Sequence, residues 1–195
     1  MTRNQIQPDE IFTRKEYLNV RPKLRKEIVN RKKKRRVDVG PYITLYFENR
    51  DTIIHQINEM VFIENGGSEQ IKEEIDAYKS LVPVGKELVA TVMIEIDSTL
   101  KRSEVLSNMG GFEEKFSILI GDKIILGKAE LDANRTTADG KASSVQFVHF
   151  NFTTEEIKMF RDVNSKILLS INHQNYSHST TLQNETKEEL ANDFY

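Results

Sequence analysis

The sequence contains no cysteine. This absence excludes disulfide bonds, thiolate catalysis, cysteine-ligated zinc and protein-bound iron–sulfur clusters, because each of them needs a cysteine sulfur. Long apolar runs are also missing. No stretch approaches the roughly 18 residues of a membrane helix, and the first residues, MTRNQIQPDEIF, lack the apolar segment of a signal peptide. We therefore expect a cytoplasmic protein that does not associate with membranes.

Signatures of known catalytic sites are absent as well. The sequence shows no Ser-His-Asp arrangement, phosphate-binding loop or dinucleotide fingerprint. Gly66-Gly67 and Gly110-Gly111 are expected to end helices and not to cradle phosphates. Catalytic residues and cofactors are thus unknown at this stage.

The sequence does contain enough apolar residues for one ordinary domain. Its 195 residues are 38% hydrophobic, and a chain of this size should bury roughly 70% of its unfolded surface. Charge divides the chain unevenly: residues 1–36 hold 13 Lys and Arg against 4 Asp and Glu, whereas residues 37–195 hold 15 against 26. We predict a basic helical N-terminal arm (1–36), an α+β core domain (37–179) and a polar C-terminal segment (180–195).

Six consecutive basic residues close the arm: Arg31, Lys32, Lys33, Lys34, Arg35 and Arg36. Such a run could neutralise the phosphates of a nucleic acid or another polyanion. No zinc finger, helix-turn-helix or aromatic RNA-binding signature accompanies it, so nucleic-acid binding is not the favoured interpretation. The alternative is that the arm docks on the acidic remainder of the chain.

Apolar periodicity predicts the secondary structure. Strands are expected at 42–47, 88–96, 116–120, 123–126, 144–152 and 166–172, and loops at 133–141 and 173–179. Helices are expected after Thr13, from Pro22 into the basic run, and over 52–64, 68–81, 98–109, 153–160 and 186–195. The tight turn at Gly121-Asp122 requires antiparallel pairing, and clustered elements favour an α+β fold. We predict a single mixed, mainly antiparallel sheet with flanking helices.

Several short segments are familiar as a set: Arg35-Arg36-Val37-x-Val39-Gly40-Pro41, Phe47-Glu48-Asn49-Arg50, Gln56-Ile57-x-Glu59-Met60, Asp139-Gly140-Lys141 and His173-x-x-Tyr176. With them, the chain resembles an uncharacterised bacterial family known only as a domain of unknown function. Glu74, Tyr78, Pro83 and Leu88-x-Ala90-Thr91 extend the resemblance over most of the chain. The family usually has a proline after the histidine, where this sequence has Gln174.

The resemblance implies a cellular process in which the protein takes part, but it does not imply a catalytic activity. Genes of the family tend to lie beside those of rubrerythrin-like and iron–sulfur redox proteins. This neighbourhood implies an accessory role in redox or peroxide handling and a protein partner of that kind. Since one fold supports many functions, it does not name a reaction.

One polar cluster is the main candidate site. Glu48 and Arg50 lie where a predicted strand passes into a helix, and Gln56 and Glu59 follow on that helix. Polar side chains often converge at such a junction, and all four match the family pattern. The alternative is that these charges only pair with neighbouring elements and fix the turn.

Histidines offer weaker candidates. His173 and Tyr176 match the family pattern and could border a pocket or simply close the sheet. His55 and Glu59, four apart on one helix face, could hold a metal if Glu48 or Glu64 converged on them, but this spacing is common and we predict no metal site.

Two functions from different classes therefore stay open. The favoured one is a non-enzymatic protein that binds a partner or a small ligand. The alternative is an enzyme or metal-binding protein that uses Glu48, Arg50, Gln56, Glu59 and His173. A pocket that joins these side chains would favour the second.

Overall fold

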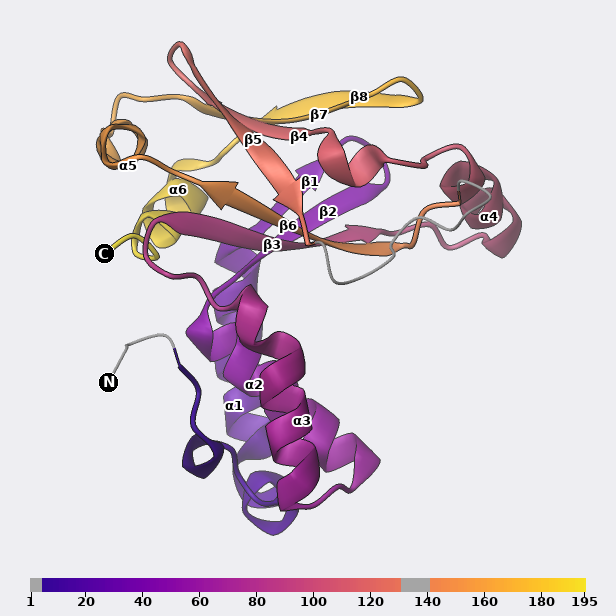
Figure 1. The fold of residues 1–195 in the computed structure, drawn as a ribbon, viewed down its shortest axis with the longest axis vertical. Coiled ribbons are helices and arrows are strands. Elements are labelled where there is room, and N and C mark those ends of the chain that lie inside the picture. The colour runs from indigo at the N-terminus through magenta and orange to yellow at the C-terminus, as the bar shows by residue number, and fades with distance from the viewer. Residues whose placement is uncertain (1–4, 131–140) are drawn as a thin grey trace.

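The computed structural model describes residues 5–130 and 141–195 and contains helices and one extended sheet (Figure 1). The α-helices are α1 (Arg14–Lys34), α2 (Arg50–Glu64), α3 (Ser68–Tyr78), α4 (Thr99–Ser107), α5 (Thr154–Arg161) and α6 (Asn184–Ala191). The strands are β1 (Arg36–Val39), β2 (Ile43–Glu48), β3 (Glu87–Ile94), β4 (Phe116–Ile120), β5 (Lys123–Ala129), β6 (Val145–Asn151), β7 (Ile167–His173) and β8 (Tyr176–Thr181). Short 3-10 turns occupy Pro8–Glu10, Lys79–Leu81 and Phe112–Glu114.

The sheet has the strand order β1-β2-β3-β6-β5-β4-β7-β8, and each pair in it is antiparallel. It curls until β1 approaches β8, so the sheet is nearly barrel-shaped. Helices α1, α2 and α3 form a separate lobe below it in Figure 1. The α+β class with a mainly antiparallel sheet is thus confirmed.

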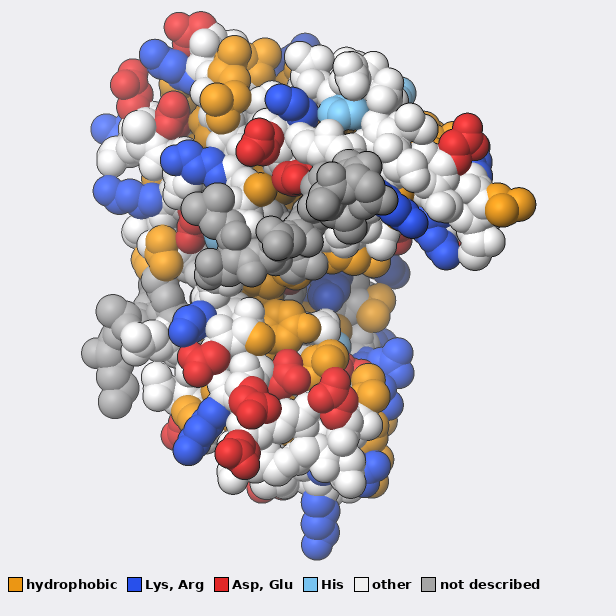
Figure 2. All heavy atoms as spheres, turned by 45° about the vertical axis from the view of Figure 1, so that its right-hand side comes forward, with side chains coloured by type: hydrophobic (Ala, Val, Ile, Leu, Met, Phe, Trp, Pro, Cys, Tyr) orange, Lys and Arg blue, Asp and Glu red, His pale blue; other side chains and the backbone are white. Residues whose placement is uncertain are grey.

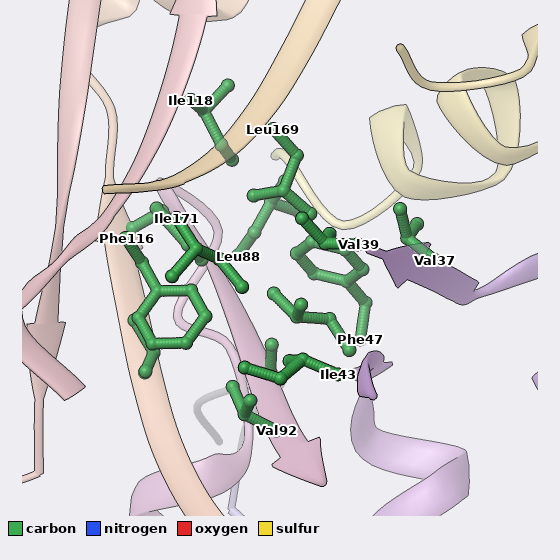
Figure 3. Close-up of a cluster of buried hydrophobic side chains, with 14 of the residues drawn as sticks. Val37, Val39, Ile43, Phe47, Leu88, Val92, Phe116, Ile118, Leu169 and Ile171 are labelled. Carbon is green, nitrogen blue, oxygen red and sulfur yellow. The ribbon is translucent and has the colours of Figure 1, made fainter. Parts of the chain in front are cut away.

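Inward-facing side chains of the curled sheet form the main core (Figure 3). Strand β3 lies in the middle of its half of the sheet and is buried on both faces, with Val89 and Ala90 both 0% exposed. This matches its nearly continuous apolar sequence, which is typical of a covered strand. A second, smaller core joins Val89 to the helical lobe through Ile53, Ile57 and Leu81.

The expectation of two helices in the N-terminal arm was wrong. The capping box of Thr13 and Glu16 begins the helix as predicted, but one helix runs through Pro22 where two were expected. Proline costs about 3 kcal/mol inside a helix, because it removes one backbone hydrogen bond. Buried residues on both sides of Pro22 help to stabilise the continuous helix: Tyr17 and Ile28 are 1% and 8% exposed.

The sequence analysis did not predict two of the strands, β1 and β8. Strand β1 buries only Val37 and Val39 and follows directly on the basic run, while β8 occupies most of the predicted loop 173–179. In β8 only Tyr176 is buried, so the polar strand shows no apolar alternation. The predicted loop at 133–141, with Asp139-Gly140, lies almost entirely outside the described residues. Among the helices that are described, none combines the length and apolar character needed to cross a membrane.

Candidate functional site

The junction between β2 and α2 is built around Asn49. Its side chain caps α2 by accepting a hydrogen bond from the Thr52 amide at 3.0 Å, and the Thr52 hydroxyl accepts one from the Asn49 amide at 2.9 Å. This reciprocal pair satisfies backbone groups that a helix start leaves free. Helix α2 therefore begins immediately after β2, and Glu48 is held on the outer face of the sheet at the foot of the helix.

A cavity of about 270 Å³ lies between this outer face and the helical lobe. The strand register explains its floor: Tyr46, Thr91 and Phe147 are paired across β2, β3 and β6, as are Thr44, Met93 and Val145 in the next row. The apolar wall consists of Ile53, Leu81, Met93, Val145 and Phe147. Figure 2 shows hydrophobic side chains reaching the surface where the sheet meets the lobe.

Polar side chains border the same cavity: Lys32, Tyr46, Glu48, Gln56, Tyr78 and Thr91. An apolar cavity with a few polar groups is the usual form of a small-molecule site, although about 300–1,000 Å³ is more common. Neither the Gln56 amide nor the Tyr78 hydroxyl makes a hydrogen bond to any described residue. Their bonding capacity is therefore available to a ligand.

Glu48 is the most buried charged group at this cavity, at 7% exposure. Its two carboxylate oxygens accept hydrogen bonds from the hydroxyls of Thr52 and Thr91, the latter at 2.7 Å. No cation in the described part of the chain lies within ion-pairing distance of it. The positive end of the α2 dipole offsets part of the charge. Buried carboxylates are otherwise paired with cations, so Glu48 retains capacity for a positive partner.

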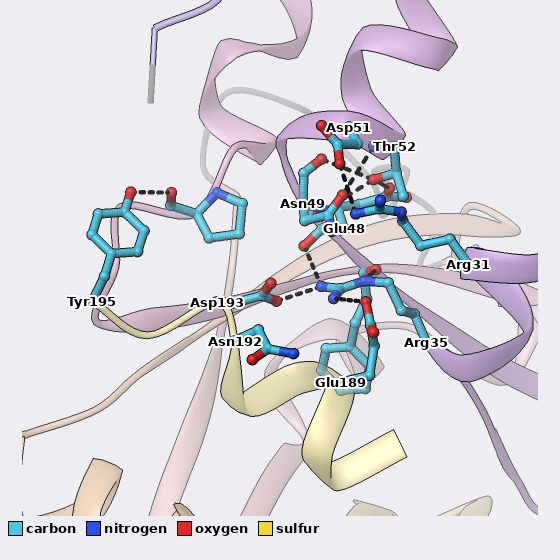
Figure 4. Close-up of polar contacts among 12 residues, drawn as sticks. Arg31, Arg35, Glu48, Asn49, Asp51, Thr52, Glu189, Asn192, Asp193 and Tyr195 are labelled. Atoms are coloured by element: carbon cyan, nitrogen blue, oxygen red, sulfur yellow. Dashed lines mark hydrogen bonds and ion pairs between the residues drawn. The ribbon is translucent and has the colours of Figure 1, made fainter. Parts of the chain in front are cut away.

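Behind Glu48, the buried Arg35 joins the end of α1 to the C-terminal segment (Figure 4). Arg35 is 1% exposed and donates hydrogen bonds to the backbone carbonyls of Phe47 and Glu48 at 2.8 and 3.0 Å. It also pairs with Asp193, just after α6, and, at 3.2 Å, with Glu189 of α6. Burial raises the pKa of Asp193, and the charge of Arg35 opposes that shift.

The rest of the basic run is distributed over the surface of the chain. Arg31 pairs with Asp51 at 2.6 Å, Lys34 with Glu185 at 3.0 Å, and Arg36 with Asp38 at 2.9 Å. The docked arrangement is thus the one that the structure shows. Polyanion binding by residues 31–36 stays a prediction. Lys32 differs from these neighbours, since it faces the cavity and makes no ion pair with any described residue.

The candidate cluster at the end of β2 is divided between sites. Glu48 and Gln56 line the 270 Å³ cavity, whereas Arg50 pairs with Glu10 and borders a larger groove of about 790 Å³ between α1, α2 and the C-terminal segment. Glu59 lines neither space. Arg50 and Gln56 line different spaces because the residue spacing on α2 places their side chains on different sides of the helix.

Glu59 instead joins α1 to α2. Arg21 binds its carboxylate through two hydrogen bonds of 2.8 Å, and the buried Tyr17 hydroxyl donates a third of 2.8 Å. The bond from Arg21 is the largest cause of the low pKa of Glu59, about 2. The nearby His55 ring contacts Tyr17 at 3.2 Å, and burial lowers its pKa. Throughout the described residues, no three His, Asp or Glu side chains are grouped as a metal site would require.

His173 and Tyr176 lie on the other half of the sheet. The His173 ring contacts the Gly110 carbonyl at 3.3 Å. The Tyr176 hydroxyl donates to the Val39 carbonyl at 2.6 Å and accepts from the amides of Tyr42 and Ile43. Tyr176 thereby fastens β8 to the turn between β1 and β2, which favours a structural role for it, although it also borders a separate cavity of about 330 Å³.

Sequence reasoning missed Lys32 as a member of the cavity and treated it as one base among six. No local signal singles it out, because its orientation depends on how α1 packs on α2. Tyr78 and Thr91 were noticed only through the family resemblance.

Comparisons with known proteins identify one family and a similar crystal structure, both described as of unknown function. A crystal structure described as a novel protein of unknown function from Burkholderia pseudomallei K96243 is 27% identical, with a TM-score of 0.90 over 98% of this chain and 100% of that one. No curated protein sequence matches the chain. The family described as protein of unknown function (DUF3501) matches residues 5–194. The chain therefore belongs to the DUF3501 family.

Proposed function

We propose that this chain is a non-enzymatic cytoplasmic accessory protein that binds a small ligand in the cavity lined by Glu48 and Gln56. The observation that carries the proposal is the Glu48 carboxylate, which is buried against an apolar wall and, among the described residues, is bonded only to neutral hydroxyls. Removing a carboxylate from water is costly unless a cation or donors compensate. A ligand that donates to Glu48 would recover this cost.

We also propose that the protein serves a redox system, and this part of the proposal rests on the family resemblance alone. A chain without cysteine cannot hold a thiolate-bound cluster. Its contribution to a rubrerythrin-like or iron–sulfur partner would therefore be to bind or deliver a ligand, while the partner supplies the redox centre.

The test uses methionine methyl groups as reporters. Met93 lines the cavity, whereas Met159 belongs to α5 and lies near Gly121, in the turn between β4 and β5. Protein labelled with ¹³C at the methionine methyls is mixed with a library of small amines, amides and amino acids. We expect some members to shift the Met93 signal and leave Met159 unchanged, and Glu48→Gln to reduce that shift.

Native mass spectrometry of protein purified from its own cells provides an independent measurement. A retained small molecule that is lost in the Glu48→Gln variant supports the proposal. Absence of both a retained molecule and any Met93-selective shift across the library contradicts it.

A further inference from the structure

We infer that the ligand of this cavity is a small zwitterion: an α-amino acid, or a molecule of the same charge pattern, with one apolar side chain. The inference rests on the proposed function and specifies its ligand. It starts from the juxtaposition of two opposite charges, Lys32 and Glu48, that border one cavity and do not pair with each other.

Glu48 provides the anionic end. Its position is fixed by the last pairing of β2 with β3, opposite Val89, and by the hydroxyls of Thr52 and Thr91. Two donated hydrogen bonds leave a carboxylate with further acceptor capacity. An ammonium group offers three donors and a full positive charge, so it suits this end better than a neutral donor does.

Lys32 provides the cationic end. It belongs to the last turn of α1, where the neighbouring Arg31 and Lys34 are both engaged by acidic residues. Lys32 is half-buried and has no acidic partner in the described chain. A ligand carboxylate at this end would form a charge-assisted contact that no protein side chain supplies.

Charge balance selects against singly charged ligands. A simple amine would satisfy Glu48 but place its positive charge near Lys32, and a simple carboxylate would bring its negative charge near Glu48. In a partly dry cavity such like-charge contacts are less screened than in water. A zwitterion satisfies both ends and leaves the net charge of the site unchanged.

Apart from these two charges, the lining of the cavity is mostly apolar, and the cavity is small. Ile53, Leu81 and Phe147 supply a wall for one aliphatic side chain, and the free groups of Gln56 and Tyr78 can bond the ligand's polar atoms. A volume of about 270 Å³ is suited to a single residue. Leucine is therefore a suitable first probe.

The first experiment compares three probes by calorimetry and by the Met93 methyl signal. Leucine carries both charges, 3-methylbutylamine lacks the carboxylate, and 4-methylpentanoate lacks the ammonium group. Each lost charge-assisted contact should weaken binding about tenfold to a hundredfold. We expect leucine to bind and both truncated probes to bind at least tenfold more weakly.

The second experiment removes one charge of the protein at a time. Glu48→Gln and Lys32→Met should each weaken leucine binding about tenfold or more. Lys33→Met is the matched control, since Lys33 is exposed and does not line the cavity. It should bind leucine as the unmodified chain does. Thermal unfolding of each variant separates lost binding from lost folding.

The outcomes distinguish this inference from the proposed function. If the amine binds as tightly as leucine and Lys32→Met has no effect, the zwitterion is wrong while a ligand site at Glu48 stands. If none of the three probes moves the Met93 signal, the inference is overturned. The proposed function fails only if the broader library and native mass spectrometry are negative too.

Discussion

Arg35 carries a charge in an environment that almost excludes water. Hydrogen bonds to two backbone carbonyls and ion pairs with Asp193 and Glu189 replace the water that its guanidinium loses. A buried ion pair adds less to stability than its Coulomb attraction suggests, because both charges lose hydration. Losing only one partner is far more costly, since the other charge stays buried alone.

We therefore expect Arg35→Met to destabilise the fold by about 3–5 kcal/mol, measured by urea unfolding. The matched control is Arg36→Met. Arg36 is the next residue but is 47% exposed at its side chain, and exposed pairs contribute about 0–1 kcal/mol. Equal effects of the two substitutions would contradict the role assigned to Arg35.

Glu48 and Gln56 could be selected from the sequence, whereas their grouping with Arg50 and Glu59 does not hold in the structure. The strand-to-helix junction marks where polar groups collect, and this much is local information. Which of them share a cavity depends on the direction of each side chain around α2 and on the neighbour that meets it. Lys32 comes from a different helix, so local patterns could not identify it.

At the scale of elements, the pairing of α1 with α2 depends on Glu59. Its bonds to Arg21 and Tyr17 fix the relative position of the two helices. Elements with a clear apolar pattern, such as the one-sided apolar face of α3 and the nearly continuous apolar run of β3, were predictable because their burial follows the local sequence. Strands β1 and β8 were not, because each is stabilised by partners that its own sequence does not encode.

The Glu59 pair predicts a specific pH dependence. The folded pKa, about 2, is below the ordinary value of 4.5. Its stabilisation is therefore complete above about pH 4.5 and is lost as the pH falls through about 2. Relative to Glu59→Gln, the unmodified chain should be more stable at pH 7 by roughly 1–2 kcal/mol, after allowance for solvent screening.

The measurement is urea unfolding of both proteins from pH 7 down to the lowest pH at which they fold. The difference between them should shrink only below pH 4.5. Glu73→Gln, on the exposed side of α3, serves as control and should show no such trend. A difference that is constant with pH would show that Glu59 acts through packing and not through its charge.

At the scale of the whole molecule, closure of the sheet brings together residues remote in the sequence. Tyr176 of β8 contacts the turn after β1, more than 130 residues away. This contact holds the two ends of the sheet near each other without pairing β1 to β8. The gap between β1 and β8 is therefore spanned by side chains, and nearby in the sequence the end of α1 pairs with α6 through Lys34–Glu185 and Arg35–Glu189.

Tyr176→Phe should loosen this closure. It removes the hydroxyl and leaves the Val39 carbonyl and the amides of Tyr42 and Ile43 without that partner. We expect a loss of about 1–3 kcal/mol in unfolding free energy. Hydrogen exchange should accelerate at Ile43 while Leu45, further along β2, keeps its protection. Equal acceleration at both amides would indicate general destabilisation and contradict a local closing role.

The long reach of Arg35 also bears on how the protein matures during translation. Its partner Asp193 is 158 residues downstream, so the nascent chain lacks this acidic partner of Arg35 until α6 and the residues after it have been synthesised. Synthesis proceeds at about 5–20 residues per second, which makes this interval several seconds or longer. The Arg35 site therefore forms only after the segment with Asp193 has been synthesised, and a chain arrested before α6 lacks both acidic partners of this guanidinium.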